Sequence, residues 1–113
     1  MDKIAIMING LPGNVTQIIT GHALEDARFK VIPYSLTGPY IDASHCQVKD
    51  TAIELIRPEN RNSAIESVLS QYPDLIAVDY THPSAVVENA SFYTAFNIPF
   101  VMGTTGGDRQ TLE

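Results

Sequence analysis

The sequence has one cysteine, no cluster of lysine or arginine, and no long apolar run. Cys46 has no second cysteine for an internal disulfide, and no Cys/His spacing of the zinc type is present, so we expect no metal. Thirteen acidic against seven basic residues give a net charge of −6. A chain of this charge without a basic stripe repels phosphate backbones, so we expect no nucleic-acid partner.

The apolar stretch at the N-terminus is short, covering only residues 4–8. A bilayer-spanning helix needs about 18 apolar residues, and no signal-peptide cleavage pattern follows this run, so we expect no membrane association. These absences predict a cytoplasmic protein. A plastid protein without its transit peptide would give the same pattern.

What is present is the composition of one packed domain. The chain has 113 residues, of which 44% are hydrophobic and 18% charged, and it contains no low-complexity tract. Domains typically have about 100–150 residues, so residues 1–113 are expected to form a single domain.

Short continuous apolar runs, typical of strands buried on both faces, alternate with segments of helical spacing. This alternation predicts an open α/β sheet, mostly parallel, with helices on both faces. The expected strands are residues 3–8, 29–36, 75–80 and 100–103, and the expected helices are residues 14–27, 60–71 and 83–96.

Three details refine this prediction. The first helix should pack against the sheet through its regularly spaced apolar residues. Pro33 implies an edge position or a bulge within the second strand, because proline lacks an amide donor. Two alternating runs separated by Lys49 and Asp50 predict a β-hairpin near residues 46–57. The apolar residues expected to face the core from the first helix are Val15, Ile18, Ile19 and Ala23.

Ligands of such sheets bind beyond the carboxyl ends of the strands, which directs attention to the loops there. After the first strand, Gly10 permits a tight turn, and Gly13 lets the backbone amides at the helix start approach a pyrophosphate. A glycine pair in a strand-helix turn also occurs for steric reasons alone, and Thr16 stands where a third glycine is common.

After the second strand, Ser35 and Thr37 offer hydroxyl groups but neither an acid for a ribose nor a base for a phosphate. The missing acid favours NADPH slightly, because no carboxylate repels its 2′-phosphate. An ordinary turn before Pro39 explains the same residues.

After the third strand, Tyr80 and Thr81 can present an aromatic face and a hydroxyl to a nucleotide. His82 lies at a helix start, where histidine is more often a surface or capping residue, and Asp79 fits a strand-end hydrogen-bond acceptor better than a base. We therefore nominate no catalytic residue in this chain.

The last strand is followed by "GTTGGDR". Three glycines give a freely bending backbone, and Thr104 and Thr105 place hydroxyls beside exposed amides, a combination suited to binding an amide or a carboxylate. Spacing alone does not distinguish this from a flexible connection.

These loops together, above all "VDYTHPSAVVENASFYTAFNIPFVMGTTGGDR", resemble the N-terminal region of the dihydrodipicolinate (4-hydroxy-tetrahydrodipicolinate) reductases, most closely the plant-like branch. The resemblance covers nearly the whole chain. It implies a Rossmann-type dinucleotide-binding domain that uses NADPH or NADH. The full-length enzyme would transfer a hydride to a cyclic unsaturated dicarboxylate in lysine (diaminopimelate) biosynthesis, as a homo-oligomer that in this family is a tetramer.

Carried over by position, the resemblance also implies roles for individual residues. The glycine-rich turn would bind the pyrophosphate, Tyr80 and Thr81 would lie near the linking ribose and phosphates, and the last loop would hold the nicotinamide carboxamide and face the substrate. The turn comprises Gly10, Pro12, Gly13, Asn14 and Val15, and the last loop comprises Gly103, Thr104 and Thr105.

The chain departs from the family pattern in three places. Asn14, Val15 and Thr16 replace a basic residue, a methionine and a small residue, and no basic residue follows the second strand. The family's His/Lys catalytic motif and Ser-Gly-Thr substrate loop do not occur in these 113 residues. We therefore expect a cofactor domain without its C-terminal substrate-binding and tetramerisation domain, inactive alone, with a helix starting near residue 108 and a tendency to dimerise or to be marginally stable.

Two other functions fit the same residues. One is another Rossmann dehydrogenase that acts on an amino or hydroxy acid. The other is a non-catalytic nucleotide-binding or assembly module, for which the short chain and the altered glycine turn are the supporting features.

Overall fold

The computed structural model describes residues 3–39, 41–81 and 83–103. A four-stranded, fully parallel sheet has the order β2-β1-β6-β7, formed by β1 (Ile4–Asn9), β2 (Phe29–Val31), β6 (Ile76–Asp79) and β7 (Phe100–Met102). β1 lies between β2 and β6, with Ile6 in register with both Val31 and Ile76. The predicted parallel α/β sheet is confirmed.

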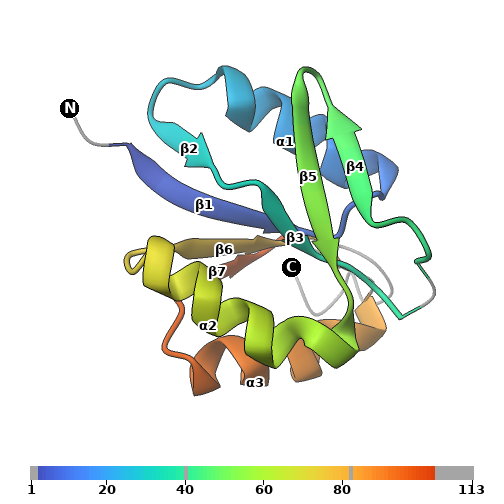
Figure 1. Cartoon of the computed structure of the whole chain (residues 1–113), viewed down its shortest axis with the longest axis vertical. Helices are drawn as coiled ribbons and strands as arrows, with labels where there is room; N and C mark the ends of the chain where they lie inside the picture. The colour runs from blue at the N-terminus through green and yellow to red at the C-terminus, as the bar shows by residue number, and fades with distance from the viewer. Residues whose placement is uncertain (1–2, 40, 82, 104–113) are drawn as a thin grey trace, which may run out of the picture.

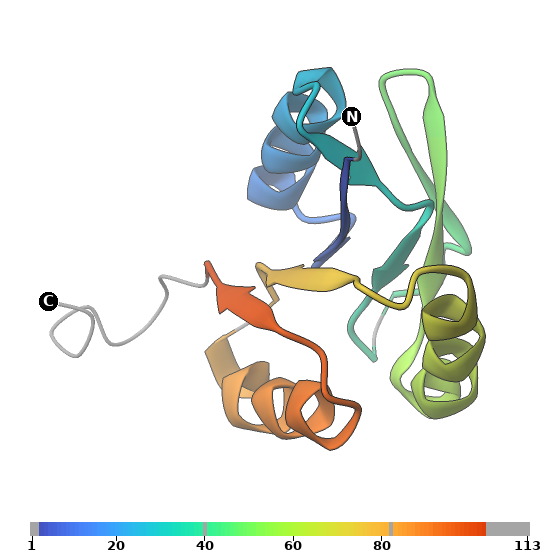
Figure 2. The same ribbon diagram turned by 90° about the vertical axis from the view of Figure 1, so that its left-hand side faces the viewer.

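Helices cover both faces of this sheet, as predicted (Figure 1, Figure 2). α1 (Asn14–Glu25) lies on one face, and α2 (Arg61–Gln71) and α3 (Val86–Ala95) lie on the other. The core between the sheet and α2/α3 centres on Met7, Ile65 and Tyr93, all with 0% exposure. No helix among the described residues is both long and apolar enough to span a bilayer.

A second, three-stranded sheet of order β3-β5-β4 lies beside the first. It contains β3 (Tyr34–Leu36), β4 (His45–Val48) and β5 (Thr51–Ile56), with β4 and β5 antiparallel. The predicted hairpin is confirmed, and its turn is formed by Lys49 and Asp50, as expected, with Lys49 at φ +53°. A short 3₁₀ helix, η1 (Pro58–Asn60), leads from β5 into α2, and a second, η2 (Pro83–Ala85), precedes α3.

The single strand predicted over residues 29–36 is wrong, because the chain divides there. β2 ends at Val31 and pairs with β1, whereas β3 begins at Tyr34 and pairs with β5. Pro33 lies between them and has no amide to donate, although its carbonyl accepts a bond from the amide of Glu54. The proline thus marks a crossing from one sheet to the other and not a bulge within one strand.

The face predicted for the first helix is wrong at Val15 and Ile18, whereas Ile19 and Ala23 are half-buried. α1 buries Thr16, Thr20 and Gly21, while Val15 and Ile18 are 61% and 60% exposed. Thr20 loses little by burial, since its hydroxyl donates to the carbonyl of Thr16 at 2.7 Å. Gly21 lets the helix approach Val48 and Lys49 of the hairpin closely.

Candidate functional site

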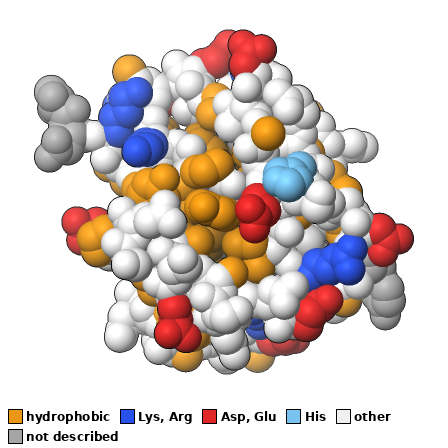
Figure 3. All heavy atoms as spheres, viewed as in Figure 1, with side chains coloured by type: hydrophobic (Ala, Val, Ile, Leu, Met, Phe, Trp, Pro, Cys, Tyr) orange, Lys and Arg blue, Asp and Glu red, His pale blue; other side chains and the backbone are white. Residues whose placement is uncertain are grey.

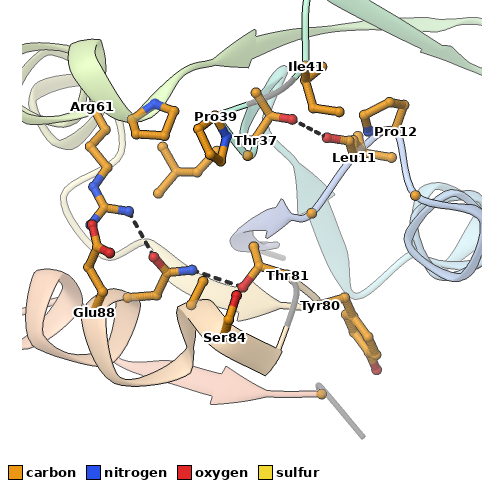
Figure 4. A pocket seen from close by; sticks show the side chains of 18 of the residues that line it. Leu11, Pro12, Thr37, Pro39, Ile41, Arg61, Tyr80, Thr81, Ser84 and Glu88 are labelled. Atoms are coloured by element: carbon orange, nitrogen blue, oxygen red, sulfur yellow. Dashed lines mark hydrogen bonds and ion pairs between the residues drawn. The ribbon is translucent and has the colours of Figure 1, made fainter. Parts of the chain in front are cut away.

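A cleft of about 1020 Å³ lies beyond the carboxyl ends of β1, β3, β6 and β7 (Figure 4). Its volume suits a large organic ligand, since small-molecule sites typically occupy about 300–1,000 Å³. Its walls come from the loop after β1, the loop after β3, the start of α2, and the segment from Tyr80 into α3. All of these except the start of α2 are segments in which the sequence placed candidate binding residues.

The turn after β1 is held by glycine. Gly10 has φ +117°, and a Cβ there would lie 2.8 Å from the carbonyl carbon of Tyr80 and 2.9 Å from Oγ1 of Thr16. Any other side chain would therefore be strained and would collide with the neighbouring loop. At Gly13 an added Cβ would lie 3.1 Å from the Gly10 carbonyl oxygen, so this position also leaves little room.

The start of α1 leaves backbone amides available to a ligand. Gly13 is the N-cap and makes no side-chain capping bond, and the first backbone bond into the helix is from Gln17 to the Gly13 carbonyl, at 2.9 Å. The amides of the first turn, with the positive end of the helix dipole, can therefore bind an anion. Pro12, Gly13 and Val15 line the cleft, whereas Asn14 is exposed and lies outside its lining.

The loop after β3 is tied to the glycine turn. The Thr37 hydroxyl donates to the carbonyl of Leu11 at 2.6 Å, and the Gly10 amide donates to the carbonyl of Leu36 at 3.0 Å. Thr37 lines the cleft, but Ser35 is fully buried on β3 and does not reach it. We therefore leave Ser35 out of the site proposed below.

The loop after β6 forms the opposite wall, with Tyr80 and Thr81 both lining the cleft. Gly103, at the end of β7, packs against the face of the Tyr80 ring so closely that an added Cβ would overlap the ring. The Gly103 amide donates to the carbonyl of Asp79 at 2.7 Å. Thr104, Thr105 and His82, as well as the helix expected near residue 108, lie outside the described residues.

Beneath this wall lies a buried polar network that the sequence reading did not find. The carboxylate of Asp79, with 0% exposure, accepts bonds from the Thr81 amide at 2.8 Å, the Thr81 hydroxyl at 2.5 Å, the Tyr93 hydroxyl at 2.5 Å and the Asn89 amide group at 3.2 Å. Asn9 donates to the Tyr93 hydroxyl at 2.8 Å. Burial, and then the Asp79 carboxylate, raise the pKa of Tyr93 above its ordinary value.

This network fixes the floor of the cleft. Asn9 also accepts the amide of Leu36 at 2.7 Å, so the ends of β1, β3, β6 and α3 are joined through side chains. Asp79 acts here as the strand-end acceptor that the sequence predicted, and its surroundings leave it no access to solvent. Its role is to position Thr81, whose hydroxyl it holds in place.

The described residues contain no group of three or more His, Cys, Asp or Glu placed to hold a metal ion. Cys46 is buried on β4, and burial raises the pKa of its thiol. The chemistry that the described cleft supports is binding and orientation of a ligand, through glycine backbone, amides and hydroxyls.

Comparison with known proteins identifies relatives over almost the whole chain. A family model described as "Dihydrodipicolinate reductase, N-terminus" matches residues 4–113. The 4-hydroxy-tetrahydrodipicolinate reductase 1, chloroplastic, of Arabidopsis thaliana is 39% identical over 109 residues, which cover 96% of this chain and 31% of the relative. A probable 4-hydroxy-tetrahydrodipicolinate reductase 2, chloroplastic, of Oryza sativa subsp. japonica is 35% identical over 107 residues, covering 95% of this chain and 33% of that protein.

A bacterial relative matches a shorter part. The 4-hydroxy-tetrahydrodipicolinate reductase of Corynebacterium aurimucosum is 35% identical over 60 residues, covering 53% of this chain and 24% of that protein. The chain thus spans about a third of the length of the plant relatives. The N-terminal domain of this family is a Rossmann-type nucleotide-binding domain that takes NADPH or NADH.

Proposed function

The chain belongs to the dihydrodipicolinate reductase family through the N-terminal domain of that family, and on this premise we propose that the cleft beyond β1, β6 and β7 binds NADPH or NADH. The observation that carries the proposal is the cleft lined by Gly10, Pro12 and Gly13, where the uncapped first turn of α1 can receive an anion. Gly10 and Gly103 shape its wall, because at both positions the space beside the glycine is filled by Tyr80. The bound nicotinamide would supply a hydride.

The proposed orientation rests on the last loop, which by its resemblance to the family would hold the nicotinamide carboxamide. The pyrophosphate lies on the amides at the start of α1, next to Gly10, Pro12, Gly13 and Val15. The nicotinamide end lies toward Gly103 at the end of β7, and the adenosine end lies toward Thr37 after β3. Tyr80 and Thr81 lie between them, by the linking ribose and phosphates. Thr104 and Thr105 belong to the nicotinamide end by their position in the sequence.

The full-length protein would then reduce a cyclic unsaturated dicarboxylate to tetrahydrodipicolinate, in lysine (diaminopimelate) biosynthesis. We propose that residues 1–113 are its cofactor domain and that a C-terminal domain supplies the substrate-binding and catalytic residues and the oligomer contacts. The relatives, three times as long as the matched segment, support this division. A cytoplasmic location stays a prediction, and the plant relatives are named chloroplastic.

A cofactor titration tests the proposal. Nicotinamide fluorescence is followed while the protein is added to NADH and, separately, to NADPH. We expect saturable binding that is lost in Gly103→Val, because the valine would overlap the Tyr80 ring and displace the loop after β6 that forms this wall of the cleft. Gly21→Ala, which changes a glycine of α1 outside the cleft, is the matched control and should bind as the wild type does.

A melting curve on each sample separates loss of the site from loss of the fold. Folded wild-type protein that binds neither cofactor at millimolar concentration would contradict the proposal. Binding that is unchanged in folded Gly103→Val would contradict the proposed place of the nicotinamide end.

A further inference from the structure

Arg61 is the only lysine or arginine among the described residues that line the cleft. It is the first residue of α2, and it enters the cleft from the side of Thr37 and Pro39, away from Tyr80 (Figure 4). The sequence has no basic residue after the second strand, where one that binds an NADP phosphate is usually found. The fold thus brings a cation to the same end of the cleft from a different element.

The guanidinium of Arg61 is fixed in position. It donates to Oδ1 of Asn89 at 2.8 Å and to Oε1 of Glu88 at 3.2 Å, and it lies over the ring of Phe92, with its central carbon 4.5 Å from the ring centroid. Its side chain is only 14% exposed. A guanidinium has five N–H donors, and within the described part of the chain only two of them are used.

The carboxylate beside it is not fixed. Glu88 is 74% exposed, and Arg61 is its only partner among the described residues. Because the carboxylate end of this ion pair lies in solvent, a ligand with higher charge can replace the carboxylate. A phosphate carries a charge of about −1.5 to −2 and accepts paired bonds from the guanidinium fork.

The nicotinamide end proposed above, at the end of β7, decides which part of a dinucleotide meets Arg61. With the pyrophosphate at the start of α1, one half of the cofactor extends toward β7 and the other toward β3. Arg61 comes from α2, and its guanidinium meets Glu88 and Asn89 of α3 at the end of the cleft opposite Tyr80 (Figure 4). Resting on the function proposed above, this places Arg61 at the adenosine half.

We propose that Arg61 binds the 2′-phosphate of NADPH and is the residue that makes the protein prefer NADPH to NADH. It is a specificity-determining residue and takes no part in the chemistry. The competing explanation is a purely structural role, in which Arg61 only joins α2 to α3 through Asn89 and Phe92.

The test compares two pairs of probes that differ in the 2′-phosphate. Dissociation constants are measured for NADPH and NADH, and for adenosine 2′,5′-bisphosphate and adenosine 5′-monophosphate, with the wild type and with Arg61→Gln, Arg61→Lys and Glu88→Gln. We expect Arg61→Gln to weaken the 2′-phosphorylated member of each pair about 10- to 100-fold and to leave the other within about twofold. Arg61→Lys should keep part of the preference because it keeps the charge.

Glu88→Gln is the matched control, since it breaks the same ion pair while keeping the cation. It should bind NADH as before and NADPH as tightly as, or more tightly than, the wild type. Partial unfolding lowers the apparent affinity for both members of a probe pair by the same factor, so the ratio of the two affinities is free of this effect.

Three results would overturn the assignment: equal weakening of both members of a pair in Arg61→Gln, no change in either, or a wild type that binds NADH as tightly as NADPH. A wild type that binds none of the four probes contradicts the proposed function itself, and the assignment with it. If NADH binds saturably and the ratio of NADPH to NADH affinity is the same in Arg61→Gln as in the wild type, only the assignment of Arg61 is overturned and the proposed function stands.

Discussion

Asp79 is the single residue on which most of the cleft floor depends. Its carboxylate is fully buried and accepts bonds from Thr81, Tyr93 and Asn89. A buried carboxylate is tolerated only when such donors surround it. Removing one donor therefore leaves the buried Asp79 carboxylate with too few hydrogen bonds to compensate for its lost hydration.

Tyr93→Phe is the sharpest test of this network. Loss of the bond to Asp79 should lower the free energy of unfolding by about 1.5–3 kcal/mol at pH 7, the range for bonds to charged groups. Urea denaturation measures it. A change within about 0.5 kcal/mol would show that the network contributes little to stability.

The same variant should change the alkaline pH dependence of stability. The pKa of Tyr93 is raised above the ordinary value of 10.0 in the folded protein, so its contribution is complete below about pH 10 and is lost as the pH rises further. The wild type should lose stability above pH 10 more steeply than Tyr93→Phe. The other tyrosines are common to both proteins, and parallel curves would contradict the raised pKa.

The limits of sequence reasoning are visible at these residues. Gly10, Gly13 and Thr81 follow predicted strands, and local spacing places them at the edge of the sheet where the cleft lies. Asn9 and Tyr93 are 84 residues apart, and Arg61 begins a helix whose place beside the cleft depends on packing across the sheet. Contacts of that range carry no local signal, so neither the network nor Arg61 was predicted.

At the scale of elements, α1 shows why apolar spacing alone does not decide the buried face of a helix. The helical spacing of Val15 and Ile18 was clear, yet both are exposed and the structure buries Thr16, Thr20 and Gly21. Gly21 lets α1 lie close to the hairpin, and Thr16 lies against Gly10 of the turn after β1. Close approach of this kind depends on the partner element, which the sequence of the helix does not contain.

Gly21→Ala should raise the stability of α1. Glycine inside a helix costs about 0.5–1 kcal/mol relative to alanine, and an added Cβ would meet only the flexible end of Lys49, with its Cε at 3.3 Å, and Val48 at 4.0 Å. Chemical denaturation should show a gain of that size.

Gly10→Ala is the contrasting substitution. Its φ of +117° and the collision with Tyr80 predict a loss of about 1–3 kcal/mol in the same assay. If Gly21→Ala loses as much stability as Gly10→Ala, α1 packs too tightly against the hairpin to accept an added methyl group.

At the scale of the whole molecule, the alternation of strands and helices was enough to predict the parallel sheet, the two helical layers and the hairpin. The crossing at Pro33 was not predicted, because continuous strand-forming residues on both sides of a proline do not reveal that two sheets share them. Apolar side chains also reach the surface, where Figure 3 shows them gathered across the middle of one face.

Exposed apolar residues favour self-association of the 113-residue chain. Ile18 is 60% and Val101 58% exposed, and within the described residues β7 is an edge strand. We expect sedimentation velocity to show a concentration-dependent dimer or larger species that Ile18→Gln with Val101→Thr weakens. A wild type that stays monomeric at high concentration and melts cooperatively at high temperature would contradict this.

The most direct test of the cofactor cleft is a two-dimensional amide NMR titration with NADPH. We expect saturable shifts of the amide signals at Gly10, Gly13, Thr37, Thr81 and Gly103, whereas the signals of the hairpin turn at Lys49 and Asp50 should not move. Shifts that leave these glycines unaffected, or no shifts at millimolar cofactor in a folded sample, would contradict the proposed cofactor cleft.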